Sequence, residues 1–341
     1  MPKKTSSLFL LLALLAVVLF IVDLAYGPVS IPVADVFKSI SGGSASHETW
    51  DYIVLNYRLP KAITAVLAGI GLSVSGLLMQ TLFRNPLAGP DVLGLSSGSM
   101  LGVAFVVMGA RFIPGIFSAW MLSSYGIIIA SCAGSFLVLL AILAVSQRLR
   151  DTMAILIVGL MFGSFTSAIV SILTYFSTAE QLQKFTFWSM GNLGNLSWVS
   201  ILILGICVLA GLGIALFSIK PLDALLLGEN YARSLGLNFK RAQLLIILGT
   251  SLLAGSITAF AGPIAFVGLA VPHMAKLMFR TSNHRILLFA TMIFGAIILL
   301  ACDILCQFPG SELMLPINAI TSIMGAPVVI WLLVHKRKSY N

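Results

Sequence analysis

The chain has 341 residues, of which 59% are hydrophobic and 9% charged, and its mean hydropathy is +1.06. A soluble globular domain carries about a quarter charged residues, so this composition excludes an ordinary soluble domain and indicates a helical membrane protein. The net charge of +9 does not indicate a nucleic-acid partner, because the basic residues separate long apolar runs and form no patch interleaved with aromatic residues.

Ten apolar windows are long enough to cross about 30 Å of hydrocarbon as helices. The seventh and eighth are the least clearly divided, because residues 242–272 carry no charge. A single helix there would measure about 45 Å, and Gly262-Pro263 offers a turn. The sequence therefore predicts one all-α, polytopic membrane domain over residues 1–341. The expected spans are 8–26, 59–80, 92–109, 125–146, 153–175, 197–218, 242–261, 263–279, 286–307 and 316–334.

The distribution of Lys and Arg predicts the orientation of these spans. If both termini are cytoplasmic, fifteen of the 20 basic residues fall in inner segments and five in outer segments. Merging the seventh and eighth windows would put the basic C-terminal tail outside. We therefore expect about ten transmembrane helices with both termini in the cytoplasm.

Residues 220–241 form the longest polar interruption that keeps an amphipathic pattern. Leu222, Leu225 and Leu226 recur at helical spacing, Gly228 interrupts the run, and a second short helical turn follows. The pattern predicts two short helices joined by a bend on the cytoplasmic side. Two interpretations stay open from these residues: a surface on which a cytoplasmic partner docks, and a solvated connector whose leucines dip into the headgroups.

Motifs for covalent chemistry are weak in this chain. The Gly94–Gly98 stretch around Ser96 matches the G-x-S-x-G of serine hydrolases, but it begins an apolar helix instead of following a strand. The sequence has neither HExxH nor a Walker loop, and its Cys and His residues lack metal-ligand spacing, so we expect no catalytic residue, metal or cofactor. An ion-coupled carrier would need a charged group in mid-span, and Asp303 is the candidate for that alternative; a structural ion pair is its other interpretation.

Four strings of residues occur in order along most of the chain. They are RLPKAITAVLAGIGLSVSGLLMQTLFRNPLAGPDVLGLSSGSMLG (58–102), GENYARSLGL (228–237), GPIAFVGLAVPH (262–273) and GAPVVIWLL (325–333). Together they resemble the FecCD family of ABC-importer permeases, whose members carry iron-siderophore complexes, haem or cobalamin across the bacterial inner membrane.

The resemblance implies a ten-helix permease subunit of the bacterial cell (inner) membrane. Its expected partners are the lipid bilayer, a second permease subunit that most simply is a copy of the same chain, two cytoplasmic ATP-binding subunits and a periplasmic or lipoprotein substrate-binding protein. ATP is then hydrolysed on a separate chain, so the permease is not an enzyme. It would move its substrate by alternating access, with an iron-siderophore complex expected and cobalamin or haem as close alternatives.

The resemblance also implies roles for individual residues. The segment 220–241 matches the family's coupling helices, which dock on the ATPase. Thr152 and Met153 match the cytoplasmic gate, and Arg58 and Lys61 match basic positions that meet acidic residues of the binding protein. The implied ATPase-coupling residues are Leu225, Gly228, Glu229, Ala232, Arg233, Leu235 and Gly236.

The sequence departs from the family pattern near its last outer loop. Gln307 stands where an arginine is frequent, and the stretch from Met314 to Asn318 replaces Glu-Leu-Pro-x-Gly. The absence of an arginine at position 307 removes one charge from the expected docking surface for the binding protein.

Overall fold

The computed structural model describes residues 3–110, 116–146, 152–194, 196–307 and 313–338. Within these ranges the secondary structure is helical, apart from an isolated bridge between Gln307 and Met314. Seven of the described helices are long and apolar enough to cross a membrane. Shorter apolar helices at Leu95–Gly109, Val267–Phe279 and Ile317–Trp331 fill the remaining predicted windows. The prediction of an all-α, polytopic membrane protein is confirmed.

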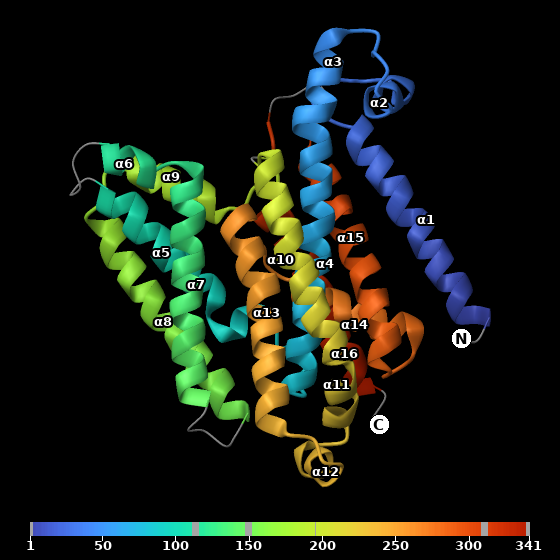
Figure 1. The fold of residues 1–341 in the computed structure, drawn as a ribbon, viewed down its shortest axis with the longest axis vertical. Helices are drawn as coiled ribbons and strands as arrows, with labels where there is room; N and C mark the ends of the chain where they lie inside the picture. Colours follow the sequence, from blue (N-terminus) through green and yellow to red (C-terminus); the bar gives the residue numbers. More distant parts are fainter. Residues whose placement is uncertain (1–2, 111–115, 147–151, 195, 308–312, 339–341) are drawn as a thin grey trace.

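The helices that fill the ten windows are α1 (Lys3–Ala25), α4 (Leu59–Leu82), α5 (Leu95–Gly109), α7 (Ser124–Ser146), α8 (Thr152–Tyr175), α10 (Trp198–Phe217), α13 (Phe239–Ala261), α14 (Val267–Phe279), α15 (His284–Cys306) and α16 (Ile317–Lys338). Several of them, such as α4, α10 and α13, run along the long axis of the molecule, whereas α5 lies oblique to it (Figure 1). The short elements are α2 (Val33–Ile40), α3 (Glu48–Ile53), the π-helical turn η1 (Val54–Arg58), the 3-10 turn η2 (Pro90–Leu93), α6 (Ile116–Met121), α9 (Ala179–Ser189), α11 (Ile219–Leu226) and α12 (Glu229–Ser234).

The two ends of the bundle carry different short helices. We call the end with α2 and α3 the outer end and the end with α11 and α12 the inner end (Figure 1). Helix α1 begins and α16 ends toward the inner end, so the two termini lie on the same side of the bundle. The charge distribution of the sequence predicts that this inner side is the cytoplasmic one.

Helix α4 is the centre of the bundle. It packs against α1, α10, α13, α14 and α15, and most of its side chains are buried. A Cβ atom on Gly69 would lie 2.2 Å from the carbonyl oxygen of Gly295 in α15, and one on Gly76 would lie 1.8 Å from the carbonyl oxygen of Gly268 in α14. Glycine at these positions lets the backbones of neighbouring helices touch, as small residues do in membrane bundles.

The helix that contains α4 continues beyond the predicted span 59–80. α3, η1 and α4 form one helical run, Glu48–Leu82, whose 35 residues extend over about 52 Å. This run is longer than the hydrocarbon layer, which is about 30 Å thick, and its outer part lies beside α2 at the top of Figure 1. There α2 packs onto the run through a small apolar cluster that includes Val36 and Val54.

The predicted division between the seventh and eighth spans is confirmed. α13 ends at Ala261, Gly262 has a φ of +76°, and α14 begins at Val267. The start of α14 lies against the start of η2, since a Cβ atom on Gly268 would lie 2.7 Å from the Pro90 ring. The backbone at the start of α14 and at the start of η2 is therefore packed inside the bundle, where it is shielded from lipid.

Candidate functional site

The two short helices predicted in residues 220–241 are present at the inner end of the bundle (Figure 1). Between α11 and α12, Gly228 has φ +101° and ψ 155°, a combination that is essentially restricted to glycine. α12 ends at Ser234, and Gly236, with φ +85°, turns the chain toward α13. Two glycines with positive φ thus shape this connection.

The side chains of this segment divide into buried and exposed sets. Leu225 and Ala232 are buried against the bundle, so these two predicted coupling residues hold the segment in place instead of facing outward. Leu227, Tyr231 and Leu235 are exposed. Leu227 and Tyr231 are not among the residues predicted from the sequence, although their spacing of four residues, continued by Leu235, is visible there.

Charged side chains lie beside these exposed apolar ones. Glu229 and Arg233 form an ion pair of 2.5 Å across one turn of α12, and the Arg233 guanidinium lies 5.4 Å from the centre of the Phe239 ring. The exposed fractions of the two charged side chains are 27% and 54%, so both remain accessible to a partner. We call Leu227, Glu229, Tyr231, Arg233 and Leu235 the α12 surface.

The two residues predicted to form a cytoplasmic gate begin α8. Thr152 and Met153 are helical, but their side chains lie outside the described part of the chain. Their role as a gate stays a prediction.

Arg58 does not present its charge to the outer surface. Its guanidinium is buried and donates hydrogen bonds to the carbonyl oxygens of Leu24 at 2.9 Å, Ala25 at 2.8 Å, and also Val29. Leu24 and Ala25 end α1, and the last carbonyl groups of a helix lack donors within that helix. Arg58 therefore caps α1, which leaves it unavailable for the docking contact that the sequence predicted.

Lys61 is also engaged within the chain. Its ammonium group lies 3.0 Å from a carboxylate oxygen of Asp303, whose side chain is 2% exposed. The Gln307 amide donates to Asp23 at 3.1 Å and to the Asp303 carboxylate at 3.4 Å. We call Asp23, Lys61, Asp303 and Gln307 the outer polar cluster; it joins α1, α4 and α15. This geometry matches the interpretation of Asp303 as half of a structural ion pair.

A cavity opens beside the outer polar cluster. It has a volume of about 420 Å³, and its lining includes Lys61, Asp303, Met190, Asn192 and Met314. Gln307 and Met314, the two departures from the family pattern, thus lie in the cluster and the cavity wall respectively. The polar side chains that line the cavity can bind a charged or hydrogen-bonding group of a ligand, and the thioethers of Met190 and Met314 supply apolar contact.

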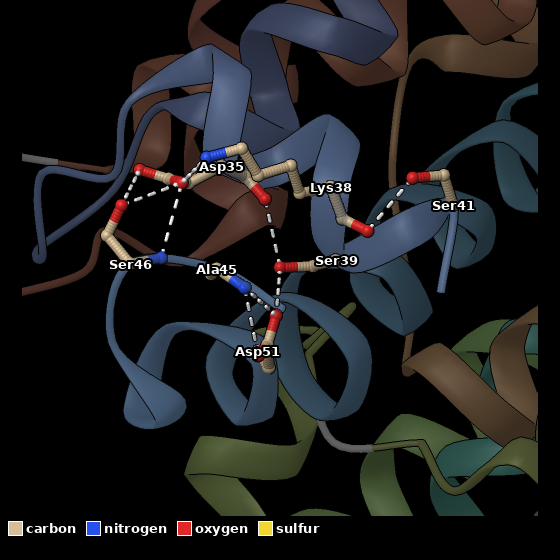
Figure 2. Close-up of polar contacts among 7 residues, drawn as sticks. All are labelled: Asp35, Lys38, Ser39, Ser41, Ala45, Ser46 and Asp51. Atoms are coloured by element: carbon tan, nitrogen blue, oxygen red, sulfur yellow. Dashed lines mark hydrogen bonds and ion pairs between the residues drawn. The ribbon is translucent and has the colours of Figure 1, made fainter. Parts of the chain in front are cut away.

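The loop between α2 and α3 is fixed by two carboxylates (Figure 2). Asp35 accepts hydrogen bonds from the Lys38 ammonium at 3.1 Å and the Ser46 hydroxyl at 3.0 Å, and Asp51 accepts one from the Ser39 hydroxyl at 2.5 Å. The contact with Lys38 is the main reason that the pKa of Asp35 lies below its ordinary value. The outer tip of the molecule is therefore a closed, hydrogen-bonded unit.

Ser96 has no hydrolase geometry. Its hydroxyl donates directly to the Asp91 carboxylate at 2.5 Å, whereas a catalytic triad places an imidazole between serine and acid. Across the described ranges, no group of three or more His, Cys, Asp or Glu side chains is arranged to hold a metal ion.

The chain is similar to known membrane permeases over nearly its whole length. The pattern of the FecCD transport family matches residues 14–335. The chain is 34% identical over 303 residues to the hemin transport permease HmuU of Yersinia pestis, covering 89% of both chains, and 37% identical over 281 residues to the vitamin B12 import permease BtuC of Klebsiella pneumoniae, covering 82% of both. A solved structure of a metal-chelate type ABC transporter in an inward-facing conformation superposes with a TM-score of 0.83 at 29% identity, over 97% of this chain and 99% of that one.

Proposed function

Because the chain belongs to the FecCD transport family, we propose that it is the membrane-spanning permease subunit of a bacterial ABC importer for a metal chelate. A second copy of the chain completes the path through the inner membrane. Two ATP-binding subunits dock at the inner end of the bundle, and a substrate-binding protein delivers the chelate to the outer end. ATP is hydrolysed on the docked subunits, and the permease changes between outward-open and inward-open states.

The α12 surface carries this proposal. A connector between two spans needs only a few polar residues, yet here two helices present exposed apolar side chains next to an accessible ion pair. Apolar side chains rimmed by charge are typical of protein docking sites. The buried Leu225 and Ala232 anchor this surface to the bundle, so that a displacement of α12 is transmitted to the membrane-spanning helices.

We propose an iron-siderophore complex as the substrate, with haem and cobalamin as the neighbouring possibilities. The relatives are named for hemin and vitamin B12, and the similar structure for metal chelates, all of which are bulky metal complexes. Uptake of radiolabelled ferric siderophore, haem and cobalamin into cells that express the transporter would decide among the three. Uptake of cobalamin alone would refute the iron assignment.

The docking role is tested by purifying the tagged chain from its native membrane in mild detergent and identifying the proteins that accompany it. We expect a stoichiometric ATPase with a Walker motif. In Gly228→Val, a β-branched side chain must adopt φ +101°, at a cost of about 1–3 kcal/mol, so the bend is displaced while the spans remain intact. We therefore expect an inserted protein in which ATP hydrolysis and transport are uncoupled.

Gly213→Ala is the matched control for this experiment. Gly213 lies inside α10, and an added Cβ atom there would meet no atom within 4 Å. This variant should keep its ATPase and its coupled transport. Coupled transport at the wild-type level in Gly228→Val would refute the docking assignment, and a preparation without any ATPase, alongside a control complex that survives the same detergent, would refute the importer itself.

A further inference from the structure

A buried histidine connects the inner short helices to the spans. His284 is the first residue of α15, and its side chain is 1% exposed. Its ring nitrogens lie 2.7 Å from the Asp223 carboxylate in α11 and 2.8 Å from the Thr81 hydroxyl in α4. Three elements that are far apart in the sequence thus meet in one chain of hydrogen bonds, which we call the inner linkage.

The inner linkage persists in either protonation state of the ring. Asp223 accepts from both the backbone N–H of His284 and Nδ1, so Nδ1 carries a proton. The Thr81 hydroxyl lies within hydrogen-bonding distance of both Nε2 and the Leu77 carbonyl oxygen. It donates to Nε2 when the ring is neutral, and it accepts from Nε2 and donates to Leu77 when the ring is charged. α11, α15 and α4 are therefore joined in both cases.

Capping of α15 does not require this arrangement. Asn283 precedes the helix, and its side chain already accepts a hydrogen bond from the backbone N–H of Arg285. Asp223 comes from 61 residues earlier in the chain, on a helix that also packs against the bundle through the buried apolar side chains of Leu222 and Leu225. Apolar contacts are non-directional, whereas a hydrogen-bonded chain holds α11 at one position.

The two spans held by the inner linkage also carry the outer polar cluster. α4 and α15 touch through Gly69 and Gly295, and packed elements of this kind transmit displacement. At their outer ends they contribute Lys61 and Asp303, which line the 420 Å³ cavity. The α4–α15 pair thus connects α11 at the inner end of the bundle with the cavity at the outer end.

We propose that His284 is a positioning residue that couples α11 to the α4–α15 pair, so that movement driven at the α12 surface reaches the outer cavity. The inference rests on the proposed function, since it requires an ATPase that moves α11. Asp223 and Thr81 act through the same linkage, so loss of either should lower the amount of substrate transported per ATP hydrolysed.

The test uses the complete transporter, with its ATPase and binding protein, reconstituted in proteoliposomes. Thr81→Val keeps the branched shape of the side chain and replaces the hydroxyl group by a methyl group, which cannot form a hydrogen bond. We expect it to lower the ratio of transport to ATP hydrolysis by about fivefold or more, which is the usual lower range of coupling between sites. Asp223→Ala should lower the ratio similarly, and Asp223→Asn, which keeps an acceptor for Nδ1–H, should restore most of it. The double variant Thr81→Val/Asp223→Ala should be no worse than either single variant.

Thr64→Val is the matched control on the same helix. Thr64 is also buried, and its hydroxyl also donates to a carbonyl four residues earlier, at 2.8 Å, but it bonds to no other helix within the part of the chain that the structure describes. The control should keep the wild-type ratio. A wild-type ratio in both Thr81→Val and Asp223→Ala would overturn the inference, as would an equal loss in Thr64→Val. Absence of an ATPase from the unmodified complex would instead refute the proposed function, so the two failures are distinguishable.

Discussion

Replacing Lys61 by methionine removes the ammonium group from the outer polar cluster, where it lies 3.0 Å from Asp303. Two carboxyl groups, Asp23 and Asp303, are then left with the Gln307 amide as their remaining side-chain donor in the cluster. At an effective dielectric constant of about 20, charges at this distance attract by about 5 to 6 kcal/mol before the cost of desolvation is subtracted. Loss of one partner from a buried pair costs about 3–5 kcal/mol, and we expect Lys61→Met to be destabilised by this amount.

Replacing the other member of the ion pair, Asp303, should reduce the stability of the protein much less. Asp303→Asn keeps an oxygen that can accept from Lys61, and it leaves one carboxyl group, Asp23, and one ammonium group in the cluster. Its expected cost is about 1 kcal/mol, which is the value of a weakened hydrogen bond. The double variant Lys61→Met/Asp303→Asn should recover stability relative to Lys61→Met, because Asp303 no longer carries a buried carboxylate that has lost its cationic partner.

Thermal unfolding of the purified variants in one detergent measures this asymmetry. Wild-type stability in Lys61→Met, or a larger loss in Asp303→Asn than in Lys61→Met, would refute the reasoning. The same Asp303→Asn protein also tests the ion-coupled carrier as an alternative function. Transport that persists in this variant and stops when ATP is depleted would exclude that alternative, whereas abolished transport in a stably folded variant would favour it.

Two further predictions concern helix contact and the outer tip. Gly76→Ala puts a Cβ atom 1.8 Å from the Gly268 carbonyl oxygen, so α4 and α14 must separate. We expect this variant to lose about 1–3 kcal/mol or more of its free energy of unfolding, measured by thermal unfolding. Gly213→Ala is the control, because its Cβ atom meets open space and its stability should be unchanged or slightly raised. The pKa of Asp35 lies below its ordinary 3.8, so the stability from its contacts is present above that value and is lost only as the pH falls through the lower, folded pKa. NMR titration of labelled aspartate carboxyls, assigned with Asp35→Asn, should show that pKa rising in Lys38→Met, and an unchanged pKa would contradict the assigned cause.

The sequence alone predicts the elements of this fold because their signals are local. Each span is a run of apolar residues, and its length is set by the thickness of the bilayer. The break before α14 follows from Gly262-Pro263, and the bend between α11 and α12 follows from Gly228, because few residues other than glycine adopt these backbone angles. The family resemblance is likewise a property of residue order, and the match over residues 14–335 confirms it.

The direction in which each side chain points was decided by the tertiary structure. Sequence reasoning treated Arg58 and Lys61 as surface charges, but the end of α1 and the carboxylate of Asp303 engage them. It placed Leu225 and Ala232 on the docking face, where the bundle instead buries them.

The inner linkage was invisible in the sequence for the same reason. Its members, Thr81, Asp223 and His284, have no common spacing and no shared motif. A buried polar group must find a partner wherever the packing of helices brings one, and that partner can lie hundreds of residues away in the chain. Local patterns specify helices and turns, whereas the pairing of buried polar groups is fixed only when the helices pack together.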